Sequence, residues 1–276
     1  MATIRVKLRM GSITYFVLRR RVCAGNQDSG RLDFMTLRAV FLDAGYTLLY
    51  PHPSVEYVCA LVCRREGHEI EAEALKRAMP PMERFIAEQK GENAHIWSAE
   101  HTVRGFWEEY YRRMLWAAGF DGVAPRLAKL MYDEFGSADY WKPFAEVEDV
   151  LKALHAMGLK VGVISDWGMQ LVGILHELEF SRYLDFVAVS ASIGVAKPNS
   201  LLYEMALARA HVDSHEAVHV GDDYRGDVLG ARSVGITPIF LDRQNRLERV
   251  DCERVTDLWG VVRYAERAIG LPSRRP

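Results

Sequence analysis

The sequence lacks any run of apolar residues long enough to cross a membrane. A transmembrane helix needs about 18 consecutive apolar residues, and no stretch of the 276 residues approaches that length. A strong excess of one charge is missing as well. The formal net charge is -2, so we expect no general attraction to nucleic acid or to an anionic membrane. Hydrophobic residues make up 49% and charged residues 26% of the chain, as in an ordinary globular protein.

Cysteine is scarce, and its spacing matches no disulfide framework. The four cysteines are Cys23, Cys59, Cys63 and Cys252. This pattern fits a reducing compartment, so a cytoplasmic location is expected. Cys59 and Cys63 would share one face of a helix. A metal site there would need two more ligands, and none stands nearby, so we expect both thiols to pack in a core.

Acidic residues are absent from the first 26 positions, which carry Arg5, Lys7, Arg9, Arg19, Arg20 and Arg21. The apolar patch at residues 13–18 falls short of a secretory core of about 7–15 residues. A transit segment, a disordered tail and an upstream translation start are compatible with this composition. We favour the last, because a foldable pattern begins abruptly at Met35. We therefore expect residues 1–34 to be a disordered or non-native N-terminal extension.

Short apolar segments alternate with helical patterns from residue 37 onward. The expected strands are 37–42, 159–164, 186–190, 217–220 and 237–241. The expected helices among them are 146–157, 200–210 and 227–234, the first and last of which end at Gly158 and Gly235. Strands this short and this apolar suit a parallel sheet that is covered by helices on both faces.

More than a hundred residues separate the first two strands, and helical patterns fill the gap at 55–66, 70–88, 100–116 and 123–135. Aromatic residues are dense there: Phe106, Trp107, Tyr110, Tyr111 and Trp116. Their spacing follows the helical period, so we expect them to form a helix core. An all-helical insert at this point would form a small second domain over the sheet edge where ligands bind.

Polar side chains follow the predicted strands at the points where the strands end. They are Asp43 and Thr47 after the first strand, Ser165 and Asp166 after the second, Lys197 after the third, and Asp222, Asp223 and Asp227 in "GDDYRGD" after the fourth. Parallel strands end at one edge of the sheet. The sequence therefore predicts one cleft that holds several carboxylates, one hydroxyl group and one ammonium group.

Carboxylates gathered in this way repel one another unless a cation lies between them. One lysine cannot balance them, whereas a divalent ion with oxygen ligands can, and Mg²⁺ is the usual ion beside phosphate. Asp43 could then attack phosphorus and form an aspartyl-phosphate. Ser165 and Lys197 would hold the phosphoryl oxygens, and we expect the Thr47 hydroxyl to join them in binding phosphate.

Four motifs in this order resemble those of the haloacid dehalogenase (HAD) superfamily. They are "FLDAGYTLL", "VISDW", "GVAKPNSLLYEMAL" and "HVGDDYRGDVLGARSVG", and the resemblance covers about residues 37–270. It implies an α/β fold, in which a Rossmann-like parallel sheet flanked by helices carries an inserted all-helical cap. The implied core is 35–50 and 142–276, and the implied cap is 51–141.

The resemblance also assigns roles to the motif residues. It implies that Asp43 is the nucleophile and that Ser165 and Lys197 bind phosphate. It implies that Asp222 is a magnesium ligand and that Asp227 supports the metal shell or Lys197. The backbone carbonyl of Gly45 should be a further metal ligand.

One acid that phosphatases of this family usually carry is missing. Their second aspartate, two residues after the nucleophile, protonates the leaving oxygen and then activates water. This sequence has Gly45 at that position. General acid–base help of this kind is worth about 10²–10⁴-fold in rate. No other acid lies between Arg38 and Tyr50, and Tyr46 is a poor base at neutral pH because a phenol has a pKa of about 10.

Three functions are compatible with this departure. We favour a Mg²⁺-dependent phosphatase that acts on a small phosphorylated metabolite with weak or selective turnover. The second is a phosphonatase- or dehalogenase-type hydrolase, for which Lys76 and Lys90 are the candidate Schiff-base lysines in the cap region. The third is a phosphate- or protein-binding module without efficient chemistry. The retained acidic motif and Lys197 favour a working site, since such charges are costly to keep together unless something binds there.

The expected partner is a small phosphorylated substrate rather than nucleic acid or a membrane, and the chain is expected to be a monomer or homodimer. Three residues beside the motifs are expected to have structural roles. We expect His219 to be a hydrogen-bonded core histidine, Asp166 to cap the next helix, and Asp223 to point to solvent. Trp167 could line the mouth of the cleft or pack in the core.

Overall fold

The computed structural model describes residues 3–10, 13–20, 37–82, 84–86, 88, 95–245 and 249–271. The chain divides into two compact units, Met1–Phe34 and Met35–Pro276. In the first unit, β1 (Thr3–Met10) pairs with β2 (Ile13–Arg20) in an antiparallel hairpin, with Thr3 opposite Arg20. These strands were not among the predicted elements, although "TIRVKLRM" alternates apolar and polar residues with the period of a strand.

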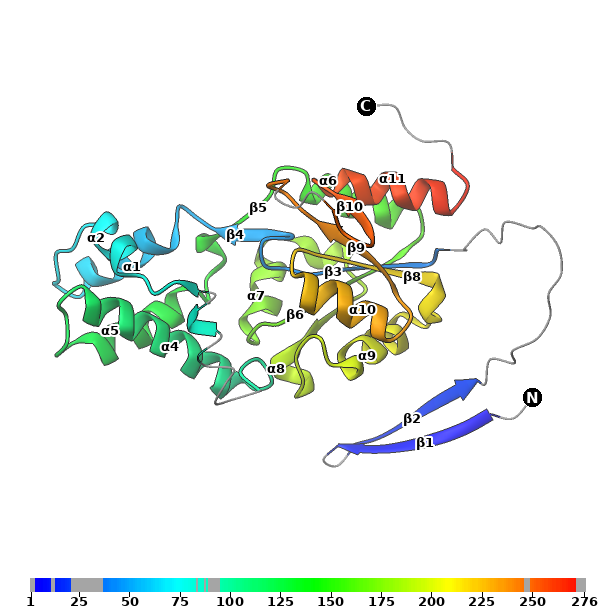
Figure 1. The fold of residues 1–276 in the computed structure, drawn as a ribbon, viewed down its shortest axis with the longest axis horizontal. Helices are drawn as coiled ribbons and strands as arrows, with labels where there is room; N and C mark the ends of the chain where they lie inside the picture. The colour runs from blue at the N-terminus through cyan, green and yellow to red at the C-terminus, as the bar shows by residue number, and fades with distance from the viewer. Residues whose placement is uncertain are drawn as a thin grey trace. The chain divides into compact units, whose positions relative to one another are not determined.

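The second unit is built on a six-stranded parallel sheet in the order β10-β9-β8-β3-β6-β7 (Figure 1). The strands are β3 (Ala39–Leu42), β6 (Lys160–Ser165), β7 (Phe186–Val189), β8 (Ala217–Gly221), β9 (Thr237–Leu241) and β10 (Glu253–Val255). The parallel sheet and the five predicted strands, which are β3, β6, β7, β8 and β9, are therefore confirmed. Strand β10 was not predicted, because it is only three residues long and carries one buried side chain.

Helices cover both faces of this sheet. The helical segments of the core are α6 (Val147–Ala156), α7 (Gln170–Glu177), η2 (Phe180–Tyr183), α8 (Ser190–Ile193), α9 (Ser200–Ala210), η3 (Ser214–Glu216), η4 (Tyr224–Leu229), α10 (Gly230–Ser233) and α11 (Trp259–Ala268). In β3, Val40 and Leu42 pack in one cluster with side chains of α6, α7 and α11. Ala39 and Phe41 face the other way and pack with α9 and α10. Alternate residues of a strand thus serve two hydrophobic layers.

The predicted helix ends are confirmed where glycine was expected. Gly158 after α6 and Gly235 after α10 have φ angles of 74° and 83°, in the left-handed region that a residue with a Cβ rarely adopts. Helices α7 and α11 were not predicted. The pattern of α7 is interrupted by Gly173, which weakens a helical signal.

A helical insert between the first two strands of the sheet lies to one side of the sheet in Figure 1. The helices for which the structure gives full bounds are α1 (Val55–Arg65), α2 (Ala72–Ala78), α4 (Glu100–Ala117) and α5 (Ala124–Glu134), followed by η1 (Ala138–Tyr140). Two short antiparallel strands, β4 (Leu49–Pro51) and β5 (Trp141–Pro143), place its entry and exit side by side. The insert has its own hydrophobic cluster, in which Cys59 and Cys63 are buried. The expected packing role of these thiols is confirmed.

Two expectations about the insert are wrong. The predicted helix at 70–88 is not continuous, because α2 ends at Ala78 before Pro80 and Pro81. Proline has no amide hydrogen to donate and disfavours helical geometry in the residue before it. Trp116 does not join the helix core either, since it is 59% exposed. Phe106, Tyr110 and Tyr111 are buried in that core as predicted.

Candidate active site

Asp43 lies where β3 ends and is the centre of a buried polar cluster. Its backbone N–H donates to the carbonyl of Val220 on β8 at 2.8 Å, which fixes the start of the loop that follows the strand. Its Oδ1 accepts hydrogen bonds from Ser165 Oγ at 3.1 Å and from Lys197 Nζ at 2.6 Å. The structure thus brings together the three residues that the sequence predicts to be catalytic, from β3, from β6 and from the loop before α9.

Lys197 is held on two sides by carboxylates. Its Nζ lies 2.6 Å from Asp43 Oδ1 and 2.6 Å from Asp227 Oδ1, and only 5% of its side chain is exposed. Its backbone N–H donates to Oδ1 of Asp166 at 2.9 Å. The expectation that Asp166 caps the next helix is therefore wrong, because it instead anchors the loop that carries Lys197. Asp166 also lines the cavity beside the cluster.

Asp227 orders the far side of the cluster. Its Oδ1 lies 2.9 Å from Nε2 of the fully buried His219, and its Oδ2 accepts from the backbone N–H of Asp223 at 3.0 Å. The expected core role of His219 is confirmed. A Cβ at Gly221 would lie 2.0 Å from Asp227 Oδ2, so only glycine at the end of β8 admits this carboxylate. The sequence signal for this approach is the glycine that opens "GDDYRGD".

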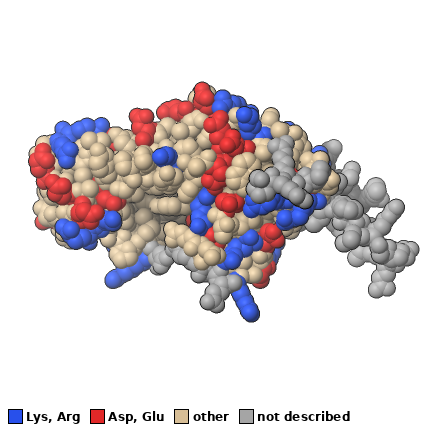
Figure 2. All heavy atoms as spheres, turned by 90° about the horizontal axis from the view of Figure 1, so that it is seen from above, with Lys and Arg blue, Asp and Glu red and all other residues tan. Residues whose placement is uncertain are grey.

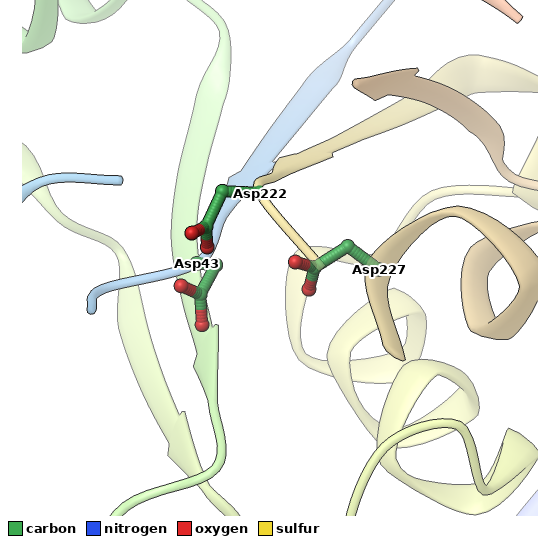
Figure 3. Close-up of side chains that lie close together, drawn as sticks. All are labelled: Asp43, Asp222 and Asp227. Atoms are coloured by element: carbon green, nitrogen blue, oxygen red, sulfur yellow. The ribbon is translucent and has the colours of Figure 1, made fainter. Parts of the chain in front are cut away.

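Figure 3 shows the carboxylates of Asp43, Asp222 and Asp227 gathered at the end of the sheet, and they offer oxygen atoms within 4.8 Å of one another. Although Asp222 is exposed, partial desolvation and the nearby charges of Asp43 and Asp227 raise the pKa of its carboxyl to about 7. Burial alone would also raise the pKa of Asp227, but the Lys197 ammonium and His219 hold it well below its usual range. The Lys197 ammonium contacts two of these three carboxylates, those of Asp43 and Asp227. Since all three offer only hard oxygen ligands, the site fits a divalent cation.

A cavity of about 460 Å³ opens from this cluster toward the insert. Its sheet side is lined by Asp43, Ser165, Asp166, Lys197, Asp222 and Asp227. Gly45, Tyr46 and Trp167 line it beside the nucleophile position. Trp167 also packs against the main core cluster, so both expectations for this residue are confirmed. The size is within the usual range of small-molecule sites.

Aromatic side chains of the insert form the other side of the cavity: Trp97, Trp107, Tyr110, Tyr111, Tyr132 and Phe135. The helical period identified some of them as core residues, and they are core residues. It could not show that they also face a cavity, because that depends on how the insert packs over the sheet. In the described part of the insert, no charged side chain lines the cavity.

The structure does not bring every predicted residue to the cavity. Thr47 is fully buried and does not line it, and its Oγ1 has no hydrogen-bond partner among the described residues. Asp223 lines the cavity and is exposed, and its Oδ1 accepts from the N–H of Arg225 at 2.9 Å. Lys76 lies outside the cavity lining, with a half-exposed side chain near Glu56 and Glu73. Lys90 lies outside the described residues.

A second polar group, which the sequence analysis missed, ties the insert to the core. Tyr132 on α5 donates to Oε1 of Glu100 at 2.8 Å and lies 3.1 Å from Oε1 of Gln170. Oε2 of Glu100 accepts from the backbone N–H of Met169 at 2.7 Å. Nothing in the sequence pattern marks these residues, because they meet only when the insert rests against the start of α7.

The family model for haloacid dehalogenase-like hydrolases matches residues 37–235. The haloacid dehalogenase-like hydrolase domain-containing protein 3 of Xenopus laevis is 40% identical over 110 residues, 40% of this chain and 45% of that protein. The chain thus spans about half the length of the frog and zebrafish relatives in these matches. The human form is 30% identical over 205 residues, which are 73% of this chain and 80% of that protein.

A phosphoserine phosphatase of Thermus thermophilus is 28% identical over 250 residues, 80% of this chain and 94% of that protein. Among solved structures, the HAD-hydrolase YfnB of Bacillus subtilis matches with a TM-score of 0.68 and 12% identity, over 83% of this chain and 98% of that chain. At that identity the likeness concerns the fold alone.

Proposed function

Because the chain belongs to the haloacid dehalogenase-like hydrolases, we propose that it is a Mg²⁺-dependent phosphatase that transfers a phosphoryl group to Asp43 and then to water. The observation that carries the proposal is the position of Lys197, whose Nζ lies 2.6 Å from Asp43 Oδ1 at the end of a cavity. A carboxylate that already touches an ammonium and a hydroxyl group has the surroundings that a phosphoryl group requires. The phosphatase names of the Thermus relative and of others support the same reaction type.

Each residue of the cluster has a separate task in this mechanism. Asp43 is the nucleophile, and Ser165 and Lys197 donate hydrogen bonds to the phosphoryl oxygens as negative charge develops on them. Asp227 holds the Lys197 ammonium in place from the other side. The residues that would hold Mg²⁺ are Asp43, Asp222 and the carbonyl of Gly45, and the bound ion would supply positive charge against the phosphoryl oxygens. Thr47 is buried and is not among the residues that line the cavity, so we do not propose it for the phosphate site.

We further propose that the insert acts as a cap. It supplies the aromatic side of the cavity, and two short strands, β4 and β5, connect it to the core. A closed cap would exclude water from the reacting groups, which strengthens the interactions of their charges. The core would then be 35–50 and 142–276, and the cap 51–141.

The size of the cavity and the mixture of surface charges favour a small molecule as partner. On the face drawn in Figure 2, acidic and basic side chains of the described residues are interspersed. None of the helices in the described ranges is long and apolar enough to span a bilayer. The buried thiols of Cys59 and Cys63 fit a cytoplasmic enzyme, which we propose to be a monomer or homodimer.

Two measurements on the full chain test this function. Titration calorimetry of metal-stripped protein should detect Mg²⁺ uptake that is strengthened by beryllofluoride, a mimic of the acyl phosphate. A screen of phosphate esters should detect phosphate release that requires Mg²⁺. Uptake without phosphate release would favour a binding module, and an absence of both would overturn the proposal.

A further inference from the structure

One side of the cavity carries charged groups. The opposite side, which we call the aromatic wall, is formed by apolar side chains of the insert. Carboxylate, ammonium and hydroxyl groups stand at the sheet side, together with the guanidinium of Arg225. On the described insert side, the lining consists of aromatic and aliphatic side chains, among them Trp107, Tyr111, Met79 and Ile86. Trp107 and Tyr111 stack with ring centroids 6.0 Å apart and planes 25° apart.

Two of the three insert tyrosines that line the cavity have their hydroxyl groups engaged elsewhere. Tyr110 donates to the carbonyl of Pro80 at 3.0 Å, and Tyr132 donates to Glu100 at 2.8 Å. What these residues offer to a ligand is therefore mainly ring carbon. A leaving group with several hydroxyl, amino or carboxyl groups would leave them without partners against this wall. A flat apolar group would instead lose contact with water and gain ring contacts.

The chemistry beside the nucleophile selects in the same direction. Residue 45 is glycine, so no acid stands two residues after Asp43 to protonate the leaving oxygen. An aliphatic alkoxide is about as basic as hydroxide, whose conjugate acid, water, has a pKa of about 15.7. It is therefore a poor leaving group without that proton. A phenolate, whose conjugate acid has a pKa of about 10, can leave without it. The wall and the missing acid are separate observations that point to the same leaving group.

We propose that the substrate is an aryl phosphate monoester, a claim that rests on the proposed function. Asp43 attacks phosphorus, the bond from phosphorus to the aryl oxygen breaks, and the electron pair leaves with that oxygen, which then takes a proton from water. Water next attacks the aspartyl-phosphate, inorganic phosphate is released and the Asp43 carboxylate is restored. The ring system lies against the aromatic wall during the first step.

A kinetic consequence distinguishes this scheme. The second step also lacks the base that an aspartate at position 45 would provide, and no choice of leaving group relieves that step. Aryl oxide is therefore released quickly in the first turnover, whereas later turnovers wait for hydrolysis of the aspartyl-phosphate. Rapid-mixing experiments should show a burst of about one equivalent of phenol or naphthol per active site.

The test uses the full chain with Mg²⁺ and four probes: 2-naphthyl phosphate, phenyl phosphate, cyclohexyl phosphate and O-phosphoserine. The two aryl esters have leaving groups of similar acidity. A KM for the naphthyl ester about 10-fold below that for the phenyl ester would therefore measure the contact of the larger ring system with the aromatic wall. Cyclohexyl phosphate should bind as a competitive inhibitor and turn over about 10²-fold more slowly than phenyl phosphate. O-phosphoserine should have the lowest kcat/KM of the four probes.

A matched pair of variants on α4 separates the wall from general effects on folding. Trp107→Ala removes a ring that lines the cavity, and Trp116→Ala removes one that is exposed and does not line it. Trp107→Ala should raise the KM for 2-naphthyl phosphate about 10-fold relative to the KM for acetyl phosphate. Trp116→Ala should leave both values within about twofold.

Each failure has its own signature. If O-phosphoserine is cleaved with a kcat/KM equal to or above that of the naphthyl ester, or Trp107→Ala and Trp116→Ala behave alike, the substrate class is wrong while the phosphatase function stands. If no burst occurs with either aryl ester although both are turned over, the proposed order of rates is overturned. If no probe is cleaved and beryllofluoride does not bind, the proposed function itself fails.

Discussion

A Cβ atom on Gly45 would lie 3.4 Å from Cζ3 of Trp167, and apart from its chain neighbours no other heavy atom of the described residues would lie within 4 Å. The indole ring therefore occupies the space beside position 45, where related phosphatases carry their second aspartate. The φ angle of Gly45 is not in the left-handed region, unlike that of Tyr46 at 53°. The backbone at position 45 thus accepts a side chain, and the ring of Trp167 is what a new side chain would meet.

Gly45→Asp should raise the turnover of esters with poor leaving groups. The new carboxyl would supply the missing proton transfer, which is worth about 10²–10⁴-fold where it is well placed. Contact with Trp167 reduces the gain, so we expect about 10–10²-fold for cyclohexyl phosphate, measured as phosphate release with Mg²⁺. Gly45→Asn has the same size but transfers no proton, and equal rates for the two variants would refute this role.

Asp43→Asn should abolish turnover and preserve the fold. The amide cannot attack phosphorus, whereas its oxygen can still accept from Ser165 and Lys197, and Lys197 keeps its ion pair with Asp227. We expect a loss of at least about 10³-fold in kcat, with an unchanged far-ultraviolet circular dichroism spectrum. Asp251→Asn is the control, because that carboxylate pairs with Arg232 outside this cavity and its loss should change kcat less than about twofold. Residual activity within tenfold of wild type would contradict the nucleophile assignment.

Lys197→Met should destabilise the metal-free protein strongly. The substitution leaves the buried carboxylates of Asp43 and Asp227 without their cation, and loss of one partner in a buried ion pair typically costs about 3–5 kcal/mol. Urea unfolding in EDTA measures the change, and Mg²⁺ should recover part of it. Lys160→Met is the matched control, since its 2.6 Å ion pair with Asp185 is half-exposed and should be worth at most about 1 kcal/mol. Equal losses in the two variants would count against a charge-based account.

Asp166→Asn should change how stability depends on pH. Burial raises the pKa of Asp166 to about 7, against the opposing charge of Lys197. Between pH 4 and 7 the unfolded carboxyl ionises while the folded one keeps its proton, so this residue makes the free energy of unfolding fall as pH rises. Asparagine removes this pH-dependent contribution to the free energy of unfolding and keeps an acceptor for the backbone N–H of Lys197. In EDTA, the variant should gain stability relative to wild type as pH rises from 4 to 7.

The control for the pH experiment has the opposite sign. Hydrogen bonds from Arg232 and Tyr224 lower the pKa of the exposed Asp251 to about 2. Its stabilising contribution is present above the unfolded pKa of about 4 and is lost toward pH 2. Asp251→Asn should therefore lose stability relative to wild type above pH 4. A pH-independent difference between wild type and Asp166→Asn would show that the Asp166 carboxyl does not titrate abnormally.

Local pattern was sufficient to predict the sheet and most of the cluster. Short apolar strands with alternate helices specify a parallel sheet, and parallel strands end at one edge. Asp43, Ser165, Lys197 and Asp227 could therefore be placed together before their distances were known. Thr47 could not be judged in this way, because whether a loop residue turns toward the cleft depends on the whole loop. The role of Asp166 was missed for a similar reason, since its partner Lys197 lies 31 residues away.

The sequence by itself determined the fold class, the order of the strands' polar ends and the absence of an acid at position 45. Only the tertiary structure decided the surroundings of that position, where an indole ring lies beside Gly45 and an aromatic wall lies across the cavity. Periodicity shows which side chains of a helix are apolar, but it does not show whether they face another helix or a ligand. That choice is made where the insert packs over the sheet, through contacts such as that of Glu100 with Met169, which join residues far apart in the chain.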